Sequence, residues 1–214
     1  MDGTLPTDLL APEQRLALSY ASGLTRARFA NLFALDRQLA QAVAKGAREP
    51  IAAQLRLAWW REFLSADAPL AVFPHAVHLH ADWRYDPGPV IAMVDGWEEL
   101  LAEPPDIAAC ARGRAAPFVA LAQALGCCPL DIEKTRRAAE RWALIDLAGH
   151  VSDPALRTKA LELAAGLGAG RLPRAMRPLA VLDGLARRAL ARGGPLLGDR
   201  LSPLVAIRLG IFGW

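Results

Sequence analysis

The chain has 214 residues, 53% of them hydrophobic and 22% charged, and its formal net charge is +3. Such a composition excludes a disordered or fibrous chain, and the length is enough to bury a sizeable core. The mild basic charge permits contact with an anionic membrane surface or a diphosphate, but no motif or base-stacking cluster indicates nucleic acid. The simplest organisation is one domain over residues 1–214.

Cysteine usage and the two ends of the chain bear on its compartment. Cys110, Cys127 and Cys128 are odd in number and include an adjacent pair, which argues against a disulfide framework and a zinc site and favours a reducing compartment. The start, MDGTLPTDLLAPEQR, lacks the apolar core of a signal peptide. The apolar end, LSPLVAIRLGIFGW, is interrupted by Pro203 and Arg208 and is too short to span a bilayer. We expect a cytoplasmic protein, at most peripheral on a membrane.

Helix signals dominate from one end to the other, and no segment sustains the period-two alternation of a strand. Proline, glycine and capping residues delimit the expected helices, with Thr25 as the cap of the second and a kink or break expected at Pro117. Their expected ranges are 12–21, 25–45, 50–66, 90–103, 106–126, 129–149, 153–167, 175–193 and 203–212, and a helix in the punctuated segment before Pro87, if present, is short and ends before that proline. The sequence thus predicts an all-α domain of roughly eight or nine helices.

The helix that Pro50 opens is rich in large apolar residues. Seven of its large apolar side chains fall on one broad ridge, namely Ile51, Leu55, Trp59 and Phe63, flanked by Leu57, Trp60 and Leu64. This pattern predicts a helix that is buried over more than half of its circumference.

Asp36 is the first candidate functional residue. It falls in the middle of an apolar stripe formed at helical spacing by Phe29, Phe33, Ala40 and Val43. Burying an unpaired carboxylate costs several kcal/mol, so the position requires a basic partner, a water-filled cavity or a metal. A magnesium site would use a second acid one helical turn later, where this sequence has Ala40.

Histidines and tryptophans are the other candidates. Three histidines lie close together in the sequence and could supply part of a metal site, namely His75, His78 and His80. Histidines in a polar loop or in partial contact with solvent are the commoner outcome of such a pattern. Trp59 and Trp60 could stack on a flat or isoprenoid ligand, but tryptophans at helical spacing with leucines more often belong to a core.

Several segments resemble landmarks of the squalene/phytoene synthase family, in the same order. FALDRQLAQAV followed by EPIAAQLRLAWWREFL is similar to its opening two helices, and PVIAMVDGWEELL, ARGRAAPFVALAQALG, RAAERWALIDL and RPLAVLDGLARRAL are similar to later ones. The resemblance covers most of the chain. It implies an all-α isoprenoid synthase fold in shortened form, with a central cavity and magnesium-dependent head-to-head condensation of two prenyl diphosphates.

The two Asp-rich motifs of active family members are degenerate in this sequence. The resemblance places Asp36 at the leading Asp of the first motif, but Phe33 stands where an Arg is expected and Ala40 where the second Asp is expected. The helix of the second motif offers Asp146, with His150 one turn later. Because this chemistry depends on charge stabilisation by clustered metals and basic groups, these losses should abolish useful turnover.

The pattern resembles the branch of the family similar to a respiratory complex I assembly factor. The leading hypothesis is a pseudoenzyme without a cofactor, a scaffold or assembly factor with a protein partner in respiratory complex assembly and peripheral contact with the inner membrane. Its candidate cavity residues are Asp36, Trp59, Trp60 and Asp146. An alternative is a magnesium-dependent prenyl transferase acting on prenyl diphosphates, with Asp36, Asp146 and His150 around one metal. A third is a helical interaction domain whose ligand cavity has closed.

Overall fold

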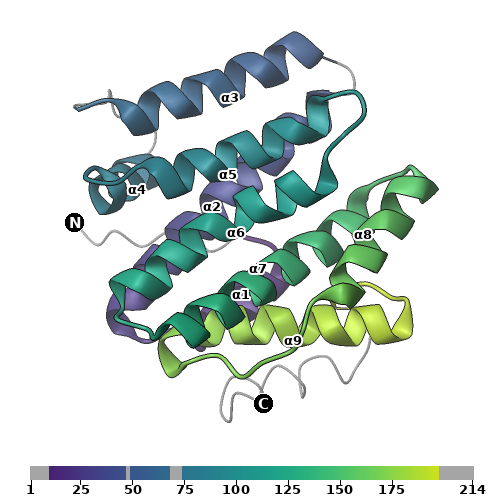
Figure 1. Cartoon of the computed structure of the whole chain (residues 1–214). Coiled ribbons are helices and arrows are strands. Elements are labelled where there is room, and N and C mark those ends of the chain that lie inside the picture. Colours follow the sequence, from purple (N-terminus) through teal and green to yellow (C-terminus); the bar gives the residue numbers. More distant parts are fainter. Residues whose placement is uncertain (1–9, 47–48, 68–73, 198–214) are drawn as a thin grey trace. The chain divides into compact units, whose positions relative to one another are not determined.

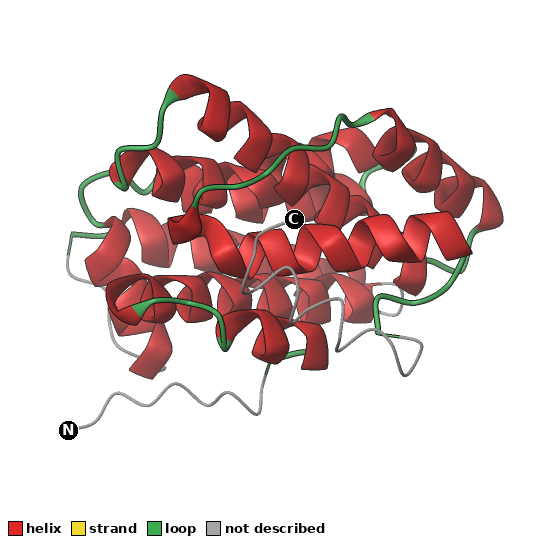
Figure 2. Cartoon of the chain, turned by 90° about the horizontal axis from the view of Figure 1, so that it is seen from below, coloured by secondary structure: helices red, strands yellow, loops and turns green. Residues whose placement is uncertain are grey.

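The computed structural model describes residues 10–46, 49–67 and 74–197. These residues form helices joined by turns and loops, with no strand among them (Figures 1 and 2). The α-helices in this part of the chain are α1 (Pro12–Leu18), α2 (Gly23–Gly46), α3 (Pro50–Ser65), α4 (Pro74–Trp83), α5 (Gly88–Glu98), α6 (Ile107–Ala124), α7 (Pro129–His150), α8 (Pro154–Gly166) and α9 (Arg177–Arg192). Two short 3₁₀ turns, Glu99–Leu101 and Arg174–Met176, follow α5 and precede α9. The predicted all-α class is confirmed.

The described helices cluster into two compact units. Among the described residues, the first contains residues 10–11 and 23–117, and the second contains residues 12–22 and 118–197. In the first unit α2 packs against α3, α4 and α5, and α3 also packs against α5. In the second unit α7 packs against α8 and α9, and α1 lies against α9.

Two glycines allow α5 and α6 to approach closely in the first unit. A Cβ added at Gly113 would lie 2.4 Å from the carbonyl oxygen of Ala92 and 2.7 Å from the Cα of Gly96. Real Cβ atoms do not tolerate such distances, so only glycine fits at this crossing. The neighbouring residues, Trp97 and Arg114, are thereby held close to one another.

Proline and glycine predicted most helix ends correctly. Pro50, Pro129 and Gly149 lie at or next to the observed ends of α3 and α7. One expectation about a boundary was wrong. Helix α2 begins at Gly23, so Thr25 lies in its first turn and is not its cap. Of the kink or break expected at Pro117, the break does not occur, because α6 continues through this proline, which has buried side chains on both sides of it. The expected last helix, residues 203–212, lies outside the described residues.

The predicted burial of α3 was wrong in part. Its buried face consists of Ala53, Leu57, Trp60, Phe63 and Leu64. Ile51 and Leu55, which the sequence predicted to be buried, are 73% and 65% exposed. The helix has two apolar ridges, and only one of them faces α2 and α5. The outer ridge remains as an exposed apolar surface.

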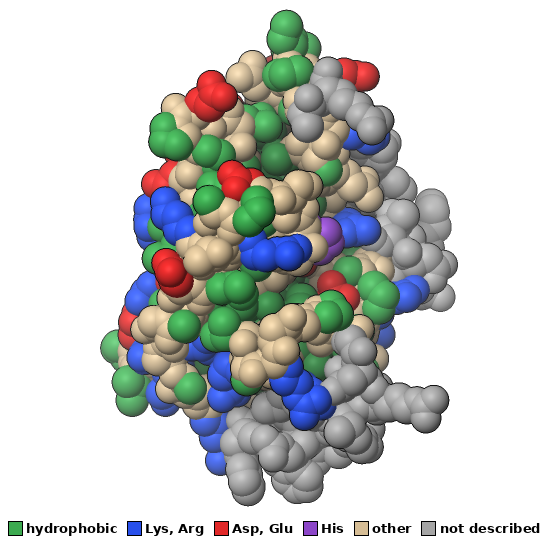
Figure 3. All heavy atoms as spheres, turned by 90° about the vertical axis from the view of Figure 1, so that its right-hand side faces the viewer, with side chains coloured by type: hydrophobic (Ala, Val, Ile, Leu, Met, Phe, Trp, Pro, Cys, Tyr) green, Lys and Arg blue, Asp and Glu red, His purple; other side chains and the backbone are tan. Residues whose placement is uncertain are grey.

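No helix in the described ranges has the length and apolar character required to cross a bilayer. Basic and acidic side chains are interspersed on the face drawn in Figure 3, with hydrophobic side chains between them. This distribution agrees with the small net charge of the sequence.

Candidate functional site

Asp36 lies inside the first unit and is held by three hydrogen bonds. Its side chain is 4% exposed, and that of Arg114 is 1% exposed. Arg114 donates from Nε to Oδ1 and from Nη2 to Oδ2, both at 2.9 Å, so the pair is bidentate. Trp97 donates from Nε1 to Oδ1, also at 2.9 Å. Of the three environments the sequence allowed, Asp36 therefore has the basic partner.

Three helices bring this cluster together. Asp36 comes from α2, Trp97 from the last turn of α5 and Arg114 from the middle of α6. The guanidinium carbon of Arg114 lies 4.5 Å from the ring centroid of Trp97, within cation–π range. The same tryptophan thus stacks on the cation and donates to the anion, which orients both partners of the ion pair.

The positions around Asp36 do not complete a metal site. Phe33 is fully buried and packs against Phe29 with ring centroids 5.8 Å apart, and Ala40 is half-buried. Both oxygens of Asp36 already accept hydrogen bonds from Arg114. Within the described part of the chain no three His, Cys, Asp or Glu side chains gather around a common point. The pairing with Arg114 therefore leaves neither oxygen of Asp36 without a hydrogen-bond donor.

The paired tryptophans of α3 lie mainly in an aromatic cluster. Trp59 packs edge-on against Trp60, at 5.0 Å between ring centroids, and stacks on Phe63 at 5.3 Å. Trp60 is 1% exposed and Trp59 is half-buried. Trp60 also forms part of the wall of a cleft between α2 and α3, so it is the candidate aromatic residue that a ligand could reach.

Asp146 belongs to α7 in the second unit. Its side chain is 17% exposed, and the Nδ1 of the exposed His150 lies 3.7 Å from its Oδ1. His150 Nδ1 is also 2.7 Å from the carbonyl oxygen of Asp146, one turn earlier in the helix. This local contact ties His150 to the end of its own helix.

The histidine segment PHAVHLH forms helix α4 and ends before Pro87, as predicted. His80 is buried, and its Nε2 lies 2.7 Å from the carbonyl oxygen of Ala66. His78 is exposed, and the side chain of His75 lies outside the described part of the structure. These contacts assign His80 a structural role.

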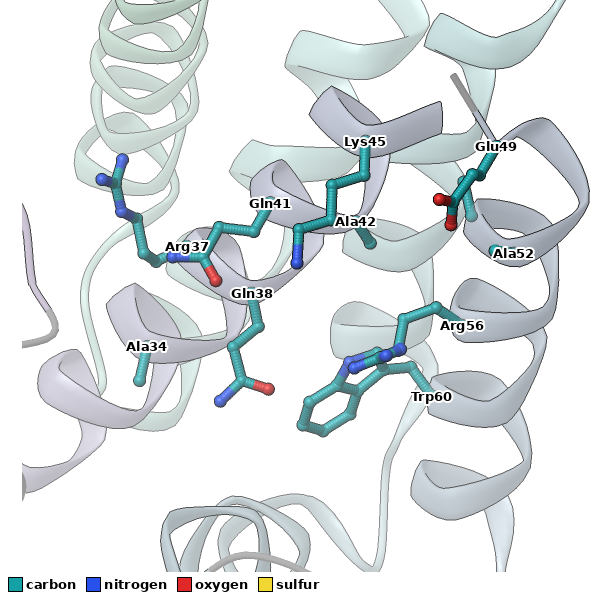
Figure 4. A pocket seen from close by; sticks show the side chains of 11 residues that line it. Ala34, Arg37, Gln38, Gln41, Ala42, Lys45, Glu49, Ala52, Arg56 and Trp60 are labelled. Carbon is teal, nitrogen blue, oxygen red and sulfur yellow. The ribbon is translucent and has the colours of Figure 1, made fainter. Parts of the chain in front are cut away.

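The cleft between α2 and α3 has a volume of about 430 Å³ (Figure 4). This volume falls within the range of small-molecule sites. Its wall combines alanines, two glutamines, three cations, one carboxylate and the indole of Trp60: Ala34, Arg37, Gln38, Gln41, Ala42, Lys45, Glu49, Ala52, Ala53, Arg56 and Trp60. In the close-up the side chains of Lys45, Glu49 and Arg56 extend toward the middle of this space. The cleft is therefore both basic and partly apolar.

A second buried ion pair organises the other unit. Arg141 on α7 donates to the carboxylate of Asp183 on α9, and both side chains are 2% exposed. The Nη2 of Arg141 donates to the carbonyl oxygens of Leu167 at 2.8 Å and Gly168 at 2.7 Å. Arg187 also approaches Asp183, at 3.1 Å. Arg141 thus connects α7, α9 and the segment after α8.

Sequence reasoning missed the cleft and both arginines of the buried pairs. The cleft left a detectable pattern, because Arg37, Gln41 and Lys45 repeat every four residues on one side of α2. Asp183 left the same detectable pattern as Asp36, because it too is an acid within an apolar helical segment. Arg114 left no detectable pattern, because an arginine 78 residues away in sequence is not specified by local periodicity.

Comparison of the chain with protein-family models, with curated proteins and with solved structures finds no match.

Proposed function

We propose that this protein is a non-catalytic member of the squalene/phytoene synthase family, built on a shortened isoprenoid synthase fold, that serves as an assembly scaffold. The observation that carries the proposal is the bidentate pairing of Asp36 with Arg114. The carboxylate expected to lead the first metal-binding motif is occupied by an internal cation and packed within the protein. The resemblance supplies the family, and this geometry favours its non-catalytic branch.

The outer ridge of α3 supports a docking role. Ile51 and Leu55 lie on successive turns and are mostly exposed, which leaves apolar area available to a partner. Arg56 follows Leu55 in the chain but extends into the cleft between α2 and α3, so the docking surface rests on the two apolar side chains. The proposed partner is a subunit or assembly intermediate of respiratory complex I at the inner membrane.

The absence of turnover is tested with purified protein, farnesyl diphosphate and magnesium. Under conditions in which an active squalene synthase converts the substrate, the expected result is no C30 product and no diphosphate release above the rate without protein. Formation of either product at an enzymatic rate contradicts the proposal and restores the prenyl transferase alternative.

The docking role is tested by replacing Leu55 with a photo-crosslinking amino acid in native cells. Crosslinks to complex I subunits or their assembly intermediates are expected from this position. The control position is Glu162, an exposed residue of α8 in the second unit. A crosslinking pattern that is the same at both positions, or that lacks these subunits, contradicts the assembly role.

A further inference from the structure

We propose that the cleft between α2 and α3 binds an anion that carries a phosphate group. Arg37 and Lys45 come from α2, and Arg56 comes from α3. None of the three has an ion-pair partner among the described residues. Other basic residues of the first unit, Arg61 and Arg114, pair with carboxylates instead. The cleft thus has cationic groups available to a ligand.

The charge balance favours an anion. Lys45 and Arg56 extend into the cleft with one carboxylate, that of Glu49, whereas the guanidinium of Arg37 points away from these groups in Figure 4, so the groups directed into the space carry one positive charge in excess. A phosphate monoester carries up to two negative charges at neutral pH and offers oxygens that guanidinium and ammonium groups bind well. The side chain of Glu49 does not cap α3, and the first-turn amides of this helix add partial positive charge at the same end of the cleft.

The remaining wall fits an organic group attached to the phosphate. Ala42 and Ala53 present small apolar surfaces, and the indole of Trp60 lies deeper in the wall. A phosphate with its oxygens occupies only part of 430 Å³, so a further group could pack on these residues. The same chemistry belongs to a soluble phosphate ester and to the headgroup of an anionic phospholipid. The inference holds whether or not the chain belongs to the squalene/phytoene synthase family.

Because Glu49 lies among the cations of the cleft, the proposal predicts opposite effects on affinity when a negative charge and when a positive charge is removed. Figure 4 shows its carboxylate directed into the space that Lys45 and Arg56 approach from the two helices. If an anion binds there, removal of the negative charge must strengthen binding, and removal of either cation must weaken it. A purely structural role of these exposed residues would not produce opposite effects on affinity.

The experiment measures binding of glycerol 3-phosphate by isothermal titration calorimetry at low salt. Lys45→Met and Arg56→Met should each raise the Kd roughly threefold to tenfold, as expected for one partly exposed charge contact. Glu49→Gln should lower the Kd by a similar factor. The matched control is Arg112→Met, which removes an exposed cation of α6 outside the cleft and should leave the Kd unchanged.

A second arm identifies the source of the phosphate. Sedimentation with vesicles of phosphatidylcholine containing phosphatidic acid is compared with pure phosphatidylcholine, for the same four variants. The cleft is assigned to a soluble phosphate ester if Lys45→Met and Arg56→Met weaken, and Glu49→Gln strengthens, binding of glycerol 3-phosphate. It is assigned to a lipid headgroup if the same effects are seen with the vesicles that contain phosphatidic acid. Absence of saturable binding in both arms overturns the proposal, as does an equal effect of Arg112→Met. Thermal melts followed by circular dichroism verify that each variant is folded.

Discussion

Removing Arg114 should destabilise the first unit far more than removing an exposed arginine. In Arg114→Met the carboxylate of Asp36 stays buried and retains only the N–H of Trp97, because both bonds from the guanidinium are lost. Breaking a buried pair on one side typically costs about 3–5 kcal/mol of unfolding free energy. The 1% and 4% exposure of the two side chains places this pair in that class.

Replacing both partners should give a different result. The double variant Asp36→Leu, Arg114→Met leaves no unpaired charge, and apolar residues of similar volume often replace a buried pair without loss. It should be more stable than Arg114→Met alone, with a coupling energy of roughly 3 kcal/mol in the double-mutant cycle. Such a rescue cannot arise if the two side chains act independently.

Urea denaturation followed by tryptophan fluorescence and by circular dichroism measures these effects. The shift in the midpoint, at constant slope, gives the change in unfolding free energy. Arg28→Met is the control, because Arg28 lies on the same helix as Asp36 and forms a 3.9 Å contact with Asp82 in which both side chains are partly exposed. Its expected loss is less than about 1 kcal/mol. An equally small loss of unfolding free energy in Arg114→Met would refute the predicted cost of breaking the pair. A double variant whose loss equals the sum of the losses of the two single variants would refute the predicted coupling.

Three further predictions concern packing, reactivity and the second buried pair. Gly113→Ala places a methyl group into the crossing of α5 and α6 and should cost about 1–3 kcal/mol in a thermal or urea melt, whereas the helical and open Gly149→Ala should stabilise the protein slightly. Burial raises the pKa of the Cys127 thiol, and the carboxylate of Asp131 adds to this effect. Its alkylation by iodoacetamide should therefore reach half-maximal rate at higher pH than that of free cysteine; an equal or lower midpoint contradicts this. Arg141→Lys should cost about 2–3 kcal/mol in urea, because a single ammonium cannot serve a carboxylate and two carbonyl oxygens; an unchanged midpoint would exclude an anchoring role.

Helix positions followed from the sequence because their ends are set locally. A proline such as Pro50 or Pro129 suits the first helical turn, and a glycine such as Gly46 or Gly193 suits the last position or the residue after it. Thr25 and Pro117 show the limit of this reasoning. A cap requires a particular backbone conformation at one residue, and a proline inside a helix ends it only if the surrounding packing does not compensate.

The faces of α3 could not be chosen from its sequence. Ile51 and Leu55 form one apolar ridge, while Leu57 and Trp60 contribute to another, and both have helical spacing. Periodicity describes which residues share a side of a helix, but contacts with α2 and α5 decide which side is buried. An apolar ridge that is left outside is therefore visible only in the structure, and this ridge supports the proposed docking role.

Asp36 was recognisable as an inward acid from its own segment, and Asp183, which was not singled out from the sequence, lies in a similar pattern; their arginine partners were not recognisable. Each acid lies among apolar residues at helical spacing, which is a local property of its own segment. Arg114 and Arg141 lie 78 and 42 residues away from these acids, where only tertiary packing specifies a contact. An arginine in a charged, helical sequence has many exposed positions available, so nothing local marks one for burial.

Each compact unit thus contains a nearly fully buried Arg–Asp pair that joins helices distant in sequence. Such pairs add little net stability, because desolvation offsets most of the attraction, but they penalise arrangements in which either charge loses its partner. A shift of α6 by one residue would separate Arg114 from Asp36 and leave two buried charges without their partners. In a chain so rich in alanine and leucine, the pairs restrict the helices to one register. Asp36 therefore points inward because it pairs with Arg114, and the double variant Asp36→Leu, Arg114→Met is expected to keep most of the stability of the protein.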